Sequence, residues 1–166
     1  REGLPVVNHT TYAIVSDGDL QEGVSHEAAG LAGHLGLGKL VWFYDDNAIS
    51  IDGPTSLSYS DDVPLRFEAY GWHVQSIDGH DMDAIAEAID AAREVADRPS
   101  IICCKTVIGK GMPTRQGTRL AHSDEPGEEE VRGAKVSYGY DPEKHFSVPP
   151  EVLEAWRAIG TRGAEG

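Results

Sequence analysis

A single stretch, Val15-Ser16-Asp17-Gly18-Asp19-Leu20-Gln21-Glu22-Gly23, separates two segments with different hydrophobic patterns. Residues 12–15 are apolar and predict a short buried strand. Residues 24–35 are rich in alanine, with apolar side chains three and four positions apart, which predicts an amphipathic helix. A strand, a glycine turn and a helix bring phosphate groups to a helix N-terminus, where free backbone N–H groups favour anions. The stretch therefore predicts a strand–turn–helix unit with an anion site at its turn.

The turn is acidic, which conflicts with a bare phosphate site. It carries Asp17, Asp19 and Glu22, and carboxylates repel a phosphate. The conflict disappears if a divalent cation lies between them, because Mg²⁺ is typically held by one or two carboxylates together with substrate phosphates. The residues thus favour a metal-bridged diphosphate. An ordinary strand-to-helix turn with acidic capping residues is the alternative that this stretch leaves open.

A second apolar strand begins at Leu40 and ends in the polar residues Asp45-Asp46-Asn47. Ligands of open parallel sheets bind outside the carboxyl ends of the strands, so both acidic clusters should lie at one edge of one sheet. Asp17 and Asn47 offer two hard oxygen ligands, and a backbone carbonyl near Ile49 offers a third. Phosphate oxygens and water could complete an octahedron around Mg²⁺.

These residues resemble a known family. Asp17-Gly18, followed thirty residues later by Asn47, resembles the thiamine diphosphate fingerprint. Four further segments resemble transketolase and follow its order: residues 22–27, 45–53, 66–72 and 104–109. The resemblance extends from about Tyr12 to about Trp156, nearly the whole chain.

The resemblance and the residue pattern predict the same fold. Four strands (12–15, from 40, 72–77 and 99–106) alternate with helices over 22–35, 63–70 and 82–96, and no hairpin signal separates them. We therefore expect an α/β fold, a mostly parallel sheet with helices on both faces, of the diphosphate-binding domain type. A short helix over 128–132 and a closing helix over 151–158 follow. We expect the domain to cover residues 1–158, with 159–166 as a linker or frayed end.

The resemblance also implies the site residues. Asp17, Asn47 and the carbonyl of Ile49 would hold Mg²⁺, with Ca²⁺ or Mn²⁺ as other possibilities. Gly18, Asn47, Ile108 and His122 would contact thiamine diphosphate. His122 would also be a catalytic residue that donates a hydrogen bond to a phosphate or to a developing alkoxide. Glu22 matches a glutamate at the subunit interface of transketolases.

The implied parent reaction transfers a two-carbon ketol unit from a ketose phosphate to an aldose phosphate, a step of the pentose phosphate pathway. The resemblance implies sugar phosphate substrates and a homodimer. Transketolases carry further segments on both sides and place the carboxylate that activates the cofactor on another domain. We therefore expect this chain to be a fragment that is inactive alone. Two alternatives stay open: a non-catalytic cofactor-binding or assembly piece, and part of another thiamine enzyme such as 1-deoxyxylulose 5-phosphate synthase or pyruvate dehydrogenase.

The chain departs from the family pattern at three places. Ser16 stands where the fingerprint usually has glycine, and Arg119 replaces a common histidine. His122 is followed by residues 123–126, Ser-Asp-Glu-Pro, where Gly-Ala-Pro is usual. The segment 107–125 is rich in glycine and, with Lys105, Lys110, Arg115 and Arg119, carries a basic cluster that either faces phosphate groups or is a solvated loop.

Composition excludes several classes of partner. The chain has 166 residues, is 40% hydrophobic and contains no long apolar run, so no membrane span is expected. A formal charge of −14 argues against nucleic acid and anionic membranes. Cys103 and Cys104 are adjacent and lack zinc-ligand spacing. With no visible secretory signal, a reduced, cytoplasmic setting is expected.

Overall fold

A computed structural model describes residues 8–122 and 124–164 of the chain. Residues 1–7 and 123 of the expected domain, and residues 165–166 of the expected C-terminal end, lie outside the described residues. None of the described helices is both long enough and apolar enough to span a membrane.

The described residues form one parallel sheet with helices between its strands. The strands are β1 (Thr11–Ser16), β2 (Leu40–Asp46), β3 (His73–Asp78) and β4 (Ser100–Lys105). Their spatial order is β1-β2-β4-β3, and every neighbouring pair is parallel. The helices are α1 (Asp17–Gln21), α2 (Gly23–His34), α3 (Val63–Ala69), α4 (Met82–Glu94), α5 (Glu128–Ser137) and α6 (Pro150–Ala164), with 3₁₀ turns η1 (Thr55–Leu57) and η2 (Arg119–Ala121). The α/β fold expected from the sequence is confirmed.

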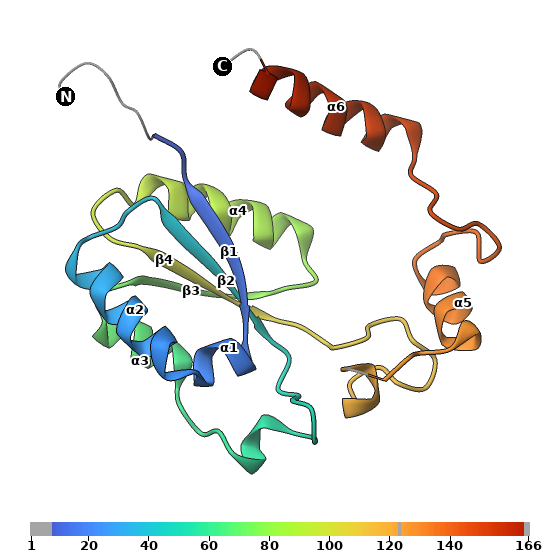
Figure 1. Cartoon of the computed structure of the whole chain (residues 1–166), viewed down its shortest axis with the longest axis horizontal. Helices are drawn as coiled ribbons and strands as arrows, with labels where there is room; N and C mark the ends of the chain where they lie inside the picture. Colours follow the sequence, from blue (N-terminus) through green and yellow to red (C-terminus); the bar gives the residue numbers. More distant parts are fainter. Residues whose placement is uncertain (1–7, 123, 165–166) are drawn as a thin grey trace.

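The strand order explains why helices cover both faces of the sheet. The chain moves in one direction from β1 through β2 to β3, and then turns back to insert β4 between β2 and β3. Because parallel crossovers are right-handed, helices on the forward path lie on one face and the helix on the return path lies on the other. Accordingly α2 and α3 lie across the sheet from α4 (Figure 1).

Two hydrophobic clusters fill these layers, and β4 contributes to both. Ile101 and Cys103 belong to the cluster under α2 and α3, whereas Ile102 and Cys104 belong to the cluster under α4. This alternation follows from the two-residue period of a strand. In the first cluster the rings of Phe67 and Trp72 pack edge to face, with their centroids 5.0 Å apart. The segment over residues 66–72 therefore has a large share in the core.

Three local predictions need correction. The expected turn after β1 is a short helix, α1, because the backbone N–H and hydroxyl of Ser16 both donate to Asp19 Oδ2 (2.8 and 2.9 Å) and cap its first turn. The helix α5 continues to Ser137, beyond the predicted residue 132, and α6 continues to Ala164 through most of the expected linker. In α6 the apolar spacing of Trp156 continues to Ile159, so the helical pattern does not stop at residue 158.

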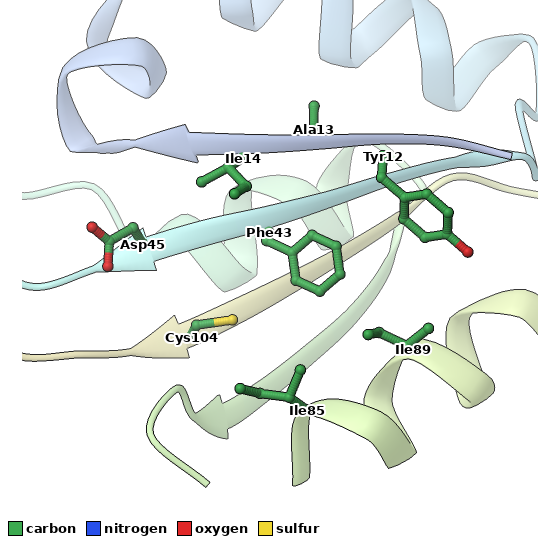
Figure 2. Close-up of a pocket in the computed structure, with 8 residues that line it drawn as sticks. All are labelled: Tyr12, Ala13, Ile14, Phe43, Asp45, Ile85, Ile89 and Cys104. Atoms are coloured by element: carbon green, nitrogen blue, oxygen red, sulfur yellow. The ribbon is translucent and has the colours of Figure 1, made fainter. Parts of the chain in front are cut away.

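One face of the sheet near its β1 edge is apolar and open. Tyr12 and Ile14 from β1 and Phe43 from β2 face Ile85 and Ile89 from α4 across a cavity of about 530 Å³ (Figure 2). The side chain of Ile14 is 81% exposed. The helix α4 thus shields this face as far as Val41 of β2 and leaves Ile14 of β1 exposed.

The helix α2 packs closely on the connection between α3 and β3 at Gly33. A Cβ added to Gly33 would lie 1.8 Å from the carbonyl oxygen of Tyr70, which is backbone and cannot rotate away. A Cβ added to Gly30, one turn earlier in the same helix, would lie 4.0 Å from the nearest neighbouring atom, Cδ1 of Tyr70. The two glycines therefore have the same helical setting and very different space around them.

We predict that Gly33→Ala lowers the free energy of unfolding by about 2–3 kcal/mol, because overpacking forces backbone shifts. Gly30→Ala is the matched control and should leave it unchanged or raise it by up to about 1 kcal/mol through helix propensity. Urea unfolding followed by circular dichroism measures both. Equal effects of the two substitutions would contradict the packing at Gly33.

Candidate functional site

A cleft of about 760 Å³ opens at the carboxyl ends of β1 and β2. All the residues proposed from the sequence as ligands or cofactor contacts line it: Asp17, Gly18, Asn47, Ile49, Ile108 and His122. They come from the start of α1, the loop after β2 and the loop after β4. Segments more than a hundred residues apart therefore meet at the sheet edge where ligands of parallel α/β folds bind.

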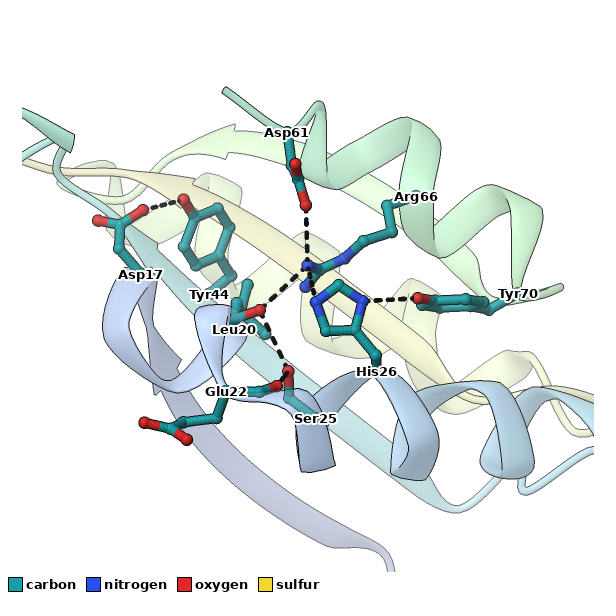
Figure 3. A network of polar contacts seen from close by, with 9 residues as sticks. All are labelled: Asp17, Leu20, Glu22, Ser25, His26, Tyr44, Asp61, Arg66 and Tyr70. Atoms are coloured by element: carbon teal, nitrogen blue, oxygen red, sulfur yellow. Dashed lines mark hydrogen bonds and ion pairs between the residues drawn. The ribbon is translucent and has the colours of Figure 1, made fainter. Parts of the chain in front are cut away.

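Asp17 is the most buried acidic side chain of this cleft, at 4% exposed. Tyr44, itself buried in β2, donates its hydroxyl to Oδ1 of Asp17 (Figure 3). Oδ2 of Asp17 is buried and has no hydrogen-bond partner among the described residues. Burial raises the pKa of Asp17, the hydrogen bond from Tyr44 lowers it, and the carboxylates of Asp46 and Asp45 raise it further. The site thus contains a carboxyl group with one buried oxygen that lacks a partner within the described ranges.

Asn47 is held from both ends of its amide group. Nδ2 donates to Oδ2 of Asp45 (3.0 Å), and Oδ1 accepts from the backbone N–H of Ile49 (2.9 Å). Between them Ala48 has a φ of 60°, in the left-handed region that residues other than glycine adopt at a cost. This strained turn brings Asn47 and Ile49 together at the cleft.

The glycine-rich loop after β4 reaches the cleft with Ile108 and His122. Its shape depends on contacts with α5: Tyr138 donates to the carbonyl of Lys110 (2.8 Å), and the backbone N–H of Thr114 donates to the buried carboxylate of Glu130 (3.2 Å). The loop also closes on itself through a 2.8 Å hydrogen bond from the N–H of Gly117 to the carbonyl of Ile108. The helix α5, for which the sequence predicts only a short helix over residues 128–132, thus positions one wall of the cleft.

The basic cluster of this loop lies apart from the cleft. Lys105 forms an ion pair with Asp46 at 2.6 Å, and Arg115 donates to the carbonyl of Leu120 at 3.2 Å. Neither these two residues nor Lys110 and Arg119 are among the residues that line the cleft. Within the described ranges, the prediction of a solvated loop therefore fits better than a phosphate-facing one.

A polar network behind the site was not anticipated from the sequence. Arg66 donates to the carbonyl of Leu20 at the end of α1 (3.0 Å) and contacts Nε2 of His26 (3.1 Å) and Asp61 (3.3 Å) (Figure 3). His26 also contacts the hydroxyl of Tyr70 through Nδ1 at 3.0 Å. His26 is therefore a part-buried link between α2 and α3.

His80 and Glu22 lie in the connections that follow β3 and β1. His80 lies in the turn after β3, and its Nε2 accepts from the backbone N–H of Val107, 2.9 Å away, at the start of the loop after β4. Glu22 is exposed at the junction of α1 and α2 and lines the cleft. A sequence pattern gives no signal for the contact of His80, because its partner is a backbone group 27 residues away.

The donor set of the cleft fits a hard cation with oxygen ligands. Within residues 8–122 and 124–164, no three His, Cys, Asp or Glu side chains cluster as a metal site. The proposed ligands are the carboxylate of Asp17, the amide oxygen of Asn47 and the backbone carbonyl of Ile49. Only Asp17 among them is a His, Cys, Asp or Glu, so a site of this kind is compatible with the absence of such a cluster from the described residues. Burial raises the pKa of Cys103 to about 12 and keeps it a thiol, which disfavours binding of a soft metal there. The uncompensated Oδ2 of Asp17 is the observation that calls for a cation.

The chain matches one family model, curated proteins and solved structures. A family model described as "Transketolase, thiamine diphosphate binding domain" matches residues 1–166. Transketolase 2 of Aliivibrio fischeri is 52% identical over 167 residues, which cover 99% of this chain and 25% of that protein. Among solved structures, transketolase from Leishmania mexicana matches with a TM-score of 0.91 and 39% identity over 99% of this chain and 25% of its own.

A transketolase from Pichia stipitis, solved in complex with sedoheptulose-7-phosphate, matches with a TM-score of 0.88 and 40% identity. The match covers 95% of this chain and 24% of that one. The chain therefore spans about a quarter of the length of the relatives that it matches.

The buried Asp17 leads to a prediction about stability without a cation. A carboxyl group with a raised pKa binds its proton more tightly in the folded state, so the free energy of unfolding falls as the pH rises from about 4 through the folded pKa. Asp17→Asn removes this ionisation and keeps the acceptor for Tyr44. It should raise the free energy of unfolding at neutral pH by about 1–3 kcal/mol and flatten its pH dependence.

Urea unfolding in EDTA, from about pH 4 to about pH 8, makes the measurement. Asp52→Asn removes the same charge from an exposed position of the same cleft and should change the free energy of unfolding by less than about 0.5 kcal/mol. An Asp17→Asn protein that is less stable than the original at neutral pH would contradict the prediction.

Proposed function

This chain belongs to the transketolase family, as part of its thiamine diphosphate-binding domain, and we propose that it anchors the cofactor diphosphate through a divalent cation. One observation carries the proposal. The only oxygen of Asp17 that has no partner among the described residues is buried at the cleft where Asn47 and Ile49 also lie. A cation held there would offset the charge of Asp17 and attract the diphosphate, which an acidic cleft would otherwise repel.

We assign the ligands and contacts as follows. Oδ2 of Asp17, Oδ1 of Asn47 and the carbonyl of Ile49 would hold Mg²⁺, and Ca²⁺ or Mn²⁺ have the same preference for oxygen. Gly18 would face the diphosphate, since an added Cβ would meet nothing closer than Oγ of Ser16 at 4.0 Å. When bound, thiamine diphosphate supplies the carbon nucleophile and the electron sink for ketol transfer.

The loop after β4 would complete the contact with the cofactor. Ile108 would contact thiamine diphosphate through its apolar side chain. His122, exposed at the end of η2, would donate a hydrogen bond to a phosphate or to a developing alkoxide, which makes it the catalytic residue of this chain. Both residues line the cleft, and this placement supports their assignment.

For the whole protein we propose transfer of a two-carbon ketol unit from a ketose phosphate to an aldose phosphate. The sugar phosphate bound by the related Pichia stipitis enzyme supports this substrate class. A homodimer with Glu22 at the subunit interface, a place in the pentose phosphate pathway and a cytoplasmic location belong to the same proposal. So does a domain limit at residue 158, although α6 continues unbroken to Ala164.

The alternatives are less well supported. Identity of 52% to a transketolase over 99% of the chain favours this activity over 1-deoxyxylulose 5-phosphate synthase or pyruvate dehydrogenase. A non-catalytic assembly piece would have no reason to bury a carboxylate oxygen without a partner, because that arrangement destabilises the fold. The cofactor-anchoring function explains it.

Calorimetric titration of thiamine diphosphate into the chain tests the proposal. We expect binding in Mg²⁺, none in EDTA, and a loss of at least about 100-fold in affinity for Asp17→Ala, because the cation loses its only carboxylate. Gly18→Ala should weaken binding by about 10-fold while the urea midpoint stays the same or rises, because the added Cβ would approach the cofactor and meets no protein atom closer than 4.0 Å. Binding that is equally strong in EDTA would contradict the metal bridge.

The activity of the chain is a separate prediction. Alone, it should show no turnover of xylulose 5-phosphate with ribose 5-phosphate, because the cofactor-activating carboxylate of the family lies on another domain. A chimera in which this chain replaces the matching quarter of the Aliivibrio fischeri transketolase 2 should be active. In that chimera His122→Ala should lower kcat by about 10²–10³-fold. A fully active isolated chain would refute the domain assignment.

A further inference from the structure

We propose that Tyr44 and Asp45, consecutive residues near the end of β2, are positioning residues that aim Asp17 and Asn47 at the cation. The inference rests on the proposed function, because it takes these two side chains as ligands. Neither Tyr44 nor Asp45 would touch the cation itself. Each would fix the orientation of one ligand through a direct hydrogen bond.

Tyr44 orients Asp17. Its hydroxyl donates to Oδ1, and both side chains are almost completely buried, at 3% and 4% exposed. A carboxylate whose Oδ1 is held in this way cannot rotate about χ2 without breaking a buried hydrogen bond. The other oxygen, Oδ2, is then the one that can bind the cation, and it has no other partner within the described residues.

Asp45 orients Asn47. An asparagine amide can bind a cation only through its oxygen, and a rotation of 180° would present the NH₂ group instead. Oδ2 of Asp45 accepts from Nδ2 of Asn47 (3.0 Å), and the N–H of Ile49 donates to Oδ1 (2.9 Å), so only one of the two orientations satisfies both neighbours. Thr106, which follows β4, donates its hydroxyl to Oδ1 of Asp45 and holds this carboxylate in turn.

The geometry of a strand explains how two adjacent residues serve two ligands. Side chains of consecutive strand residues point to opposite faces of a sheet. Tyr44 points toward the core under α2 and α3 and meets Asp17, at the start of α1. Asp45 points to the opposite face, the face of Phe43 and Cys104 (Figure 2), and meets Asn47 and Thr106. The strand β2 therefore supplies one positioning residue for each ligand, Tyr44 for Asp17 and Asp45 for Asn47.

Hydrogen bonds of this kind have measurable effects on metal binding. Loss of a residue that orients a metal ligand typically lowers metal affinity by about 10–100-fold. Tyr44→Phe removes the hydroxyl without changing the ring, and Asp45→Ala removes the acceptor of Asn47. We expect each to raise the Mg²⁺ concentration needed for half-maximal binding of thiamine diphosphate by about 10-fold or more. Asp45→Asn retains an acceptor oxygen and should restore most of the affinity.

The chain offers a matched control for each variant. Tyr59→Phe also removes a buried tyrosine hydroxyl beside the same core, one that has no hydrogen-bond partner in the described part of the chain. Asp46→Ala removes the same charge from the neighbouring position of β2, where the carboxylate pairs with Lys105. Both controls should change the Mg²⁺ requirement by less than about 3-fold. They separate positioning from loss of stability and from loss of local charge.

Calorimetric titrations of thiamine diphosphate into the 166-residue chain, at a series of Mg²⁺ concentrations, provide the first readout. In the Aliivibrio fischeri chimera, the apparent Mg²⁺ constant for turnover provides the second. For Tyr44→Phe and Asp45→Ala we expect a raised Mg²⁺ constant with kcat at saturating Mg²⁺ unchanged within about 2-fold, because positioning affects cation binding and not the chemical step.

The outcomes are distinguishable. If the unsubstituted chain and the chimera both bind cofactor without Mg²⁺, the proposed function fails, and the positioning roles fail with it. If binding needs Mg²⁺ but Tyr44→Phe and Asp45→Ala behave like Tyr59→Phe and Asp46→Ala, only the positioning roles are wrong. A fall in kcat at saturating Mg²⁺ with an unchanged Mg²⁺ constant also overturns them, since it places the effect in the chemistry.

Discussion

The burial of the Asp17 carboxylate is the constraint on which the site depends. A charged group removed from water is costly unless it is paired, and Asp17 has one donor, Tyr44, for its two oxygens. The rest of the local structure serves to hold it there. Asp19 accepts hydrogen bonds from the backbone N–H and the hydroxyl of Ser16, and these bonds cap the start of α1. Arg66 donates to the carbonyl of Leu20 near the end of the same helix. A helix of five residues is not stable by itself, so these contacts are what keep Asp17 in place.

The sheet provides the second half of the site by bringing distant segments to one edge. Ser16 of β1 and Asp45 of β2 are direct neighbours in the register. Asp17, the first residue after β1, and Asn47, the first residue after β2, therefore lie at the same end of the sheet. The order β1-β2-β4-β3 then places the loop after β4 beside the loop after β2. Closure of the cleft by this loop depends on α5 as well as on the sheet, through the contacts of Tyr138 and Glu130 with the loop backbone.

Much of this arrangement could be predicted from residue types and spacing. The strands, the parallel sheet, the helices on both faces and the convergence of Asp17 with Asn47 follow from apolar periodicity and from strand ends rich in oxygen ligands. Tyr44 could not be identified, because a tyrosine inside an apolar strand has the same pattern as any core residue. Its role depends on a hydroxyl contact with a residue 27 positions away. Arg66 and His26 were missed for the same reason: their partners are distant in the sequence.

The cleft and the core make opposite contributions to the fold. The two hydrophobic clusters stabilise the sheet on both faces, whereas the unpaired oxygen of Asp17 and the left-handed Ala48 are local costs. A ligand that binds only the folded state adds its binding free energy to the stability of the fold. Binding can therefore offset the free energy that these two local features cost. A cation at Asp17 would remove the first cost directly, by pairing the orphaned oxygen. It would also explain the strained turn at Ala48, because that turn brings the amide of Asn47 and the backbone of Ile49 to the same cleft, where both could bind the cation.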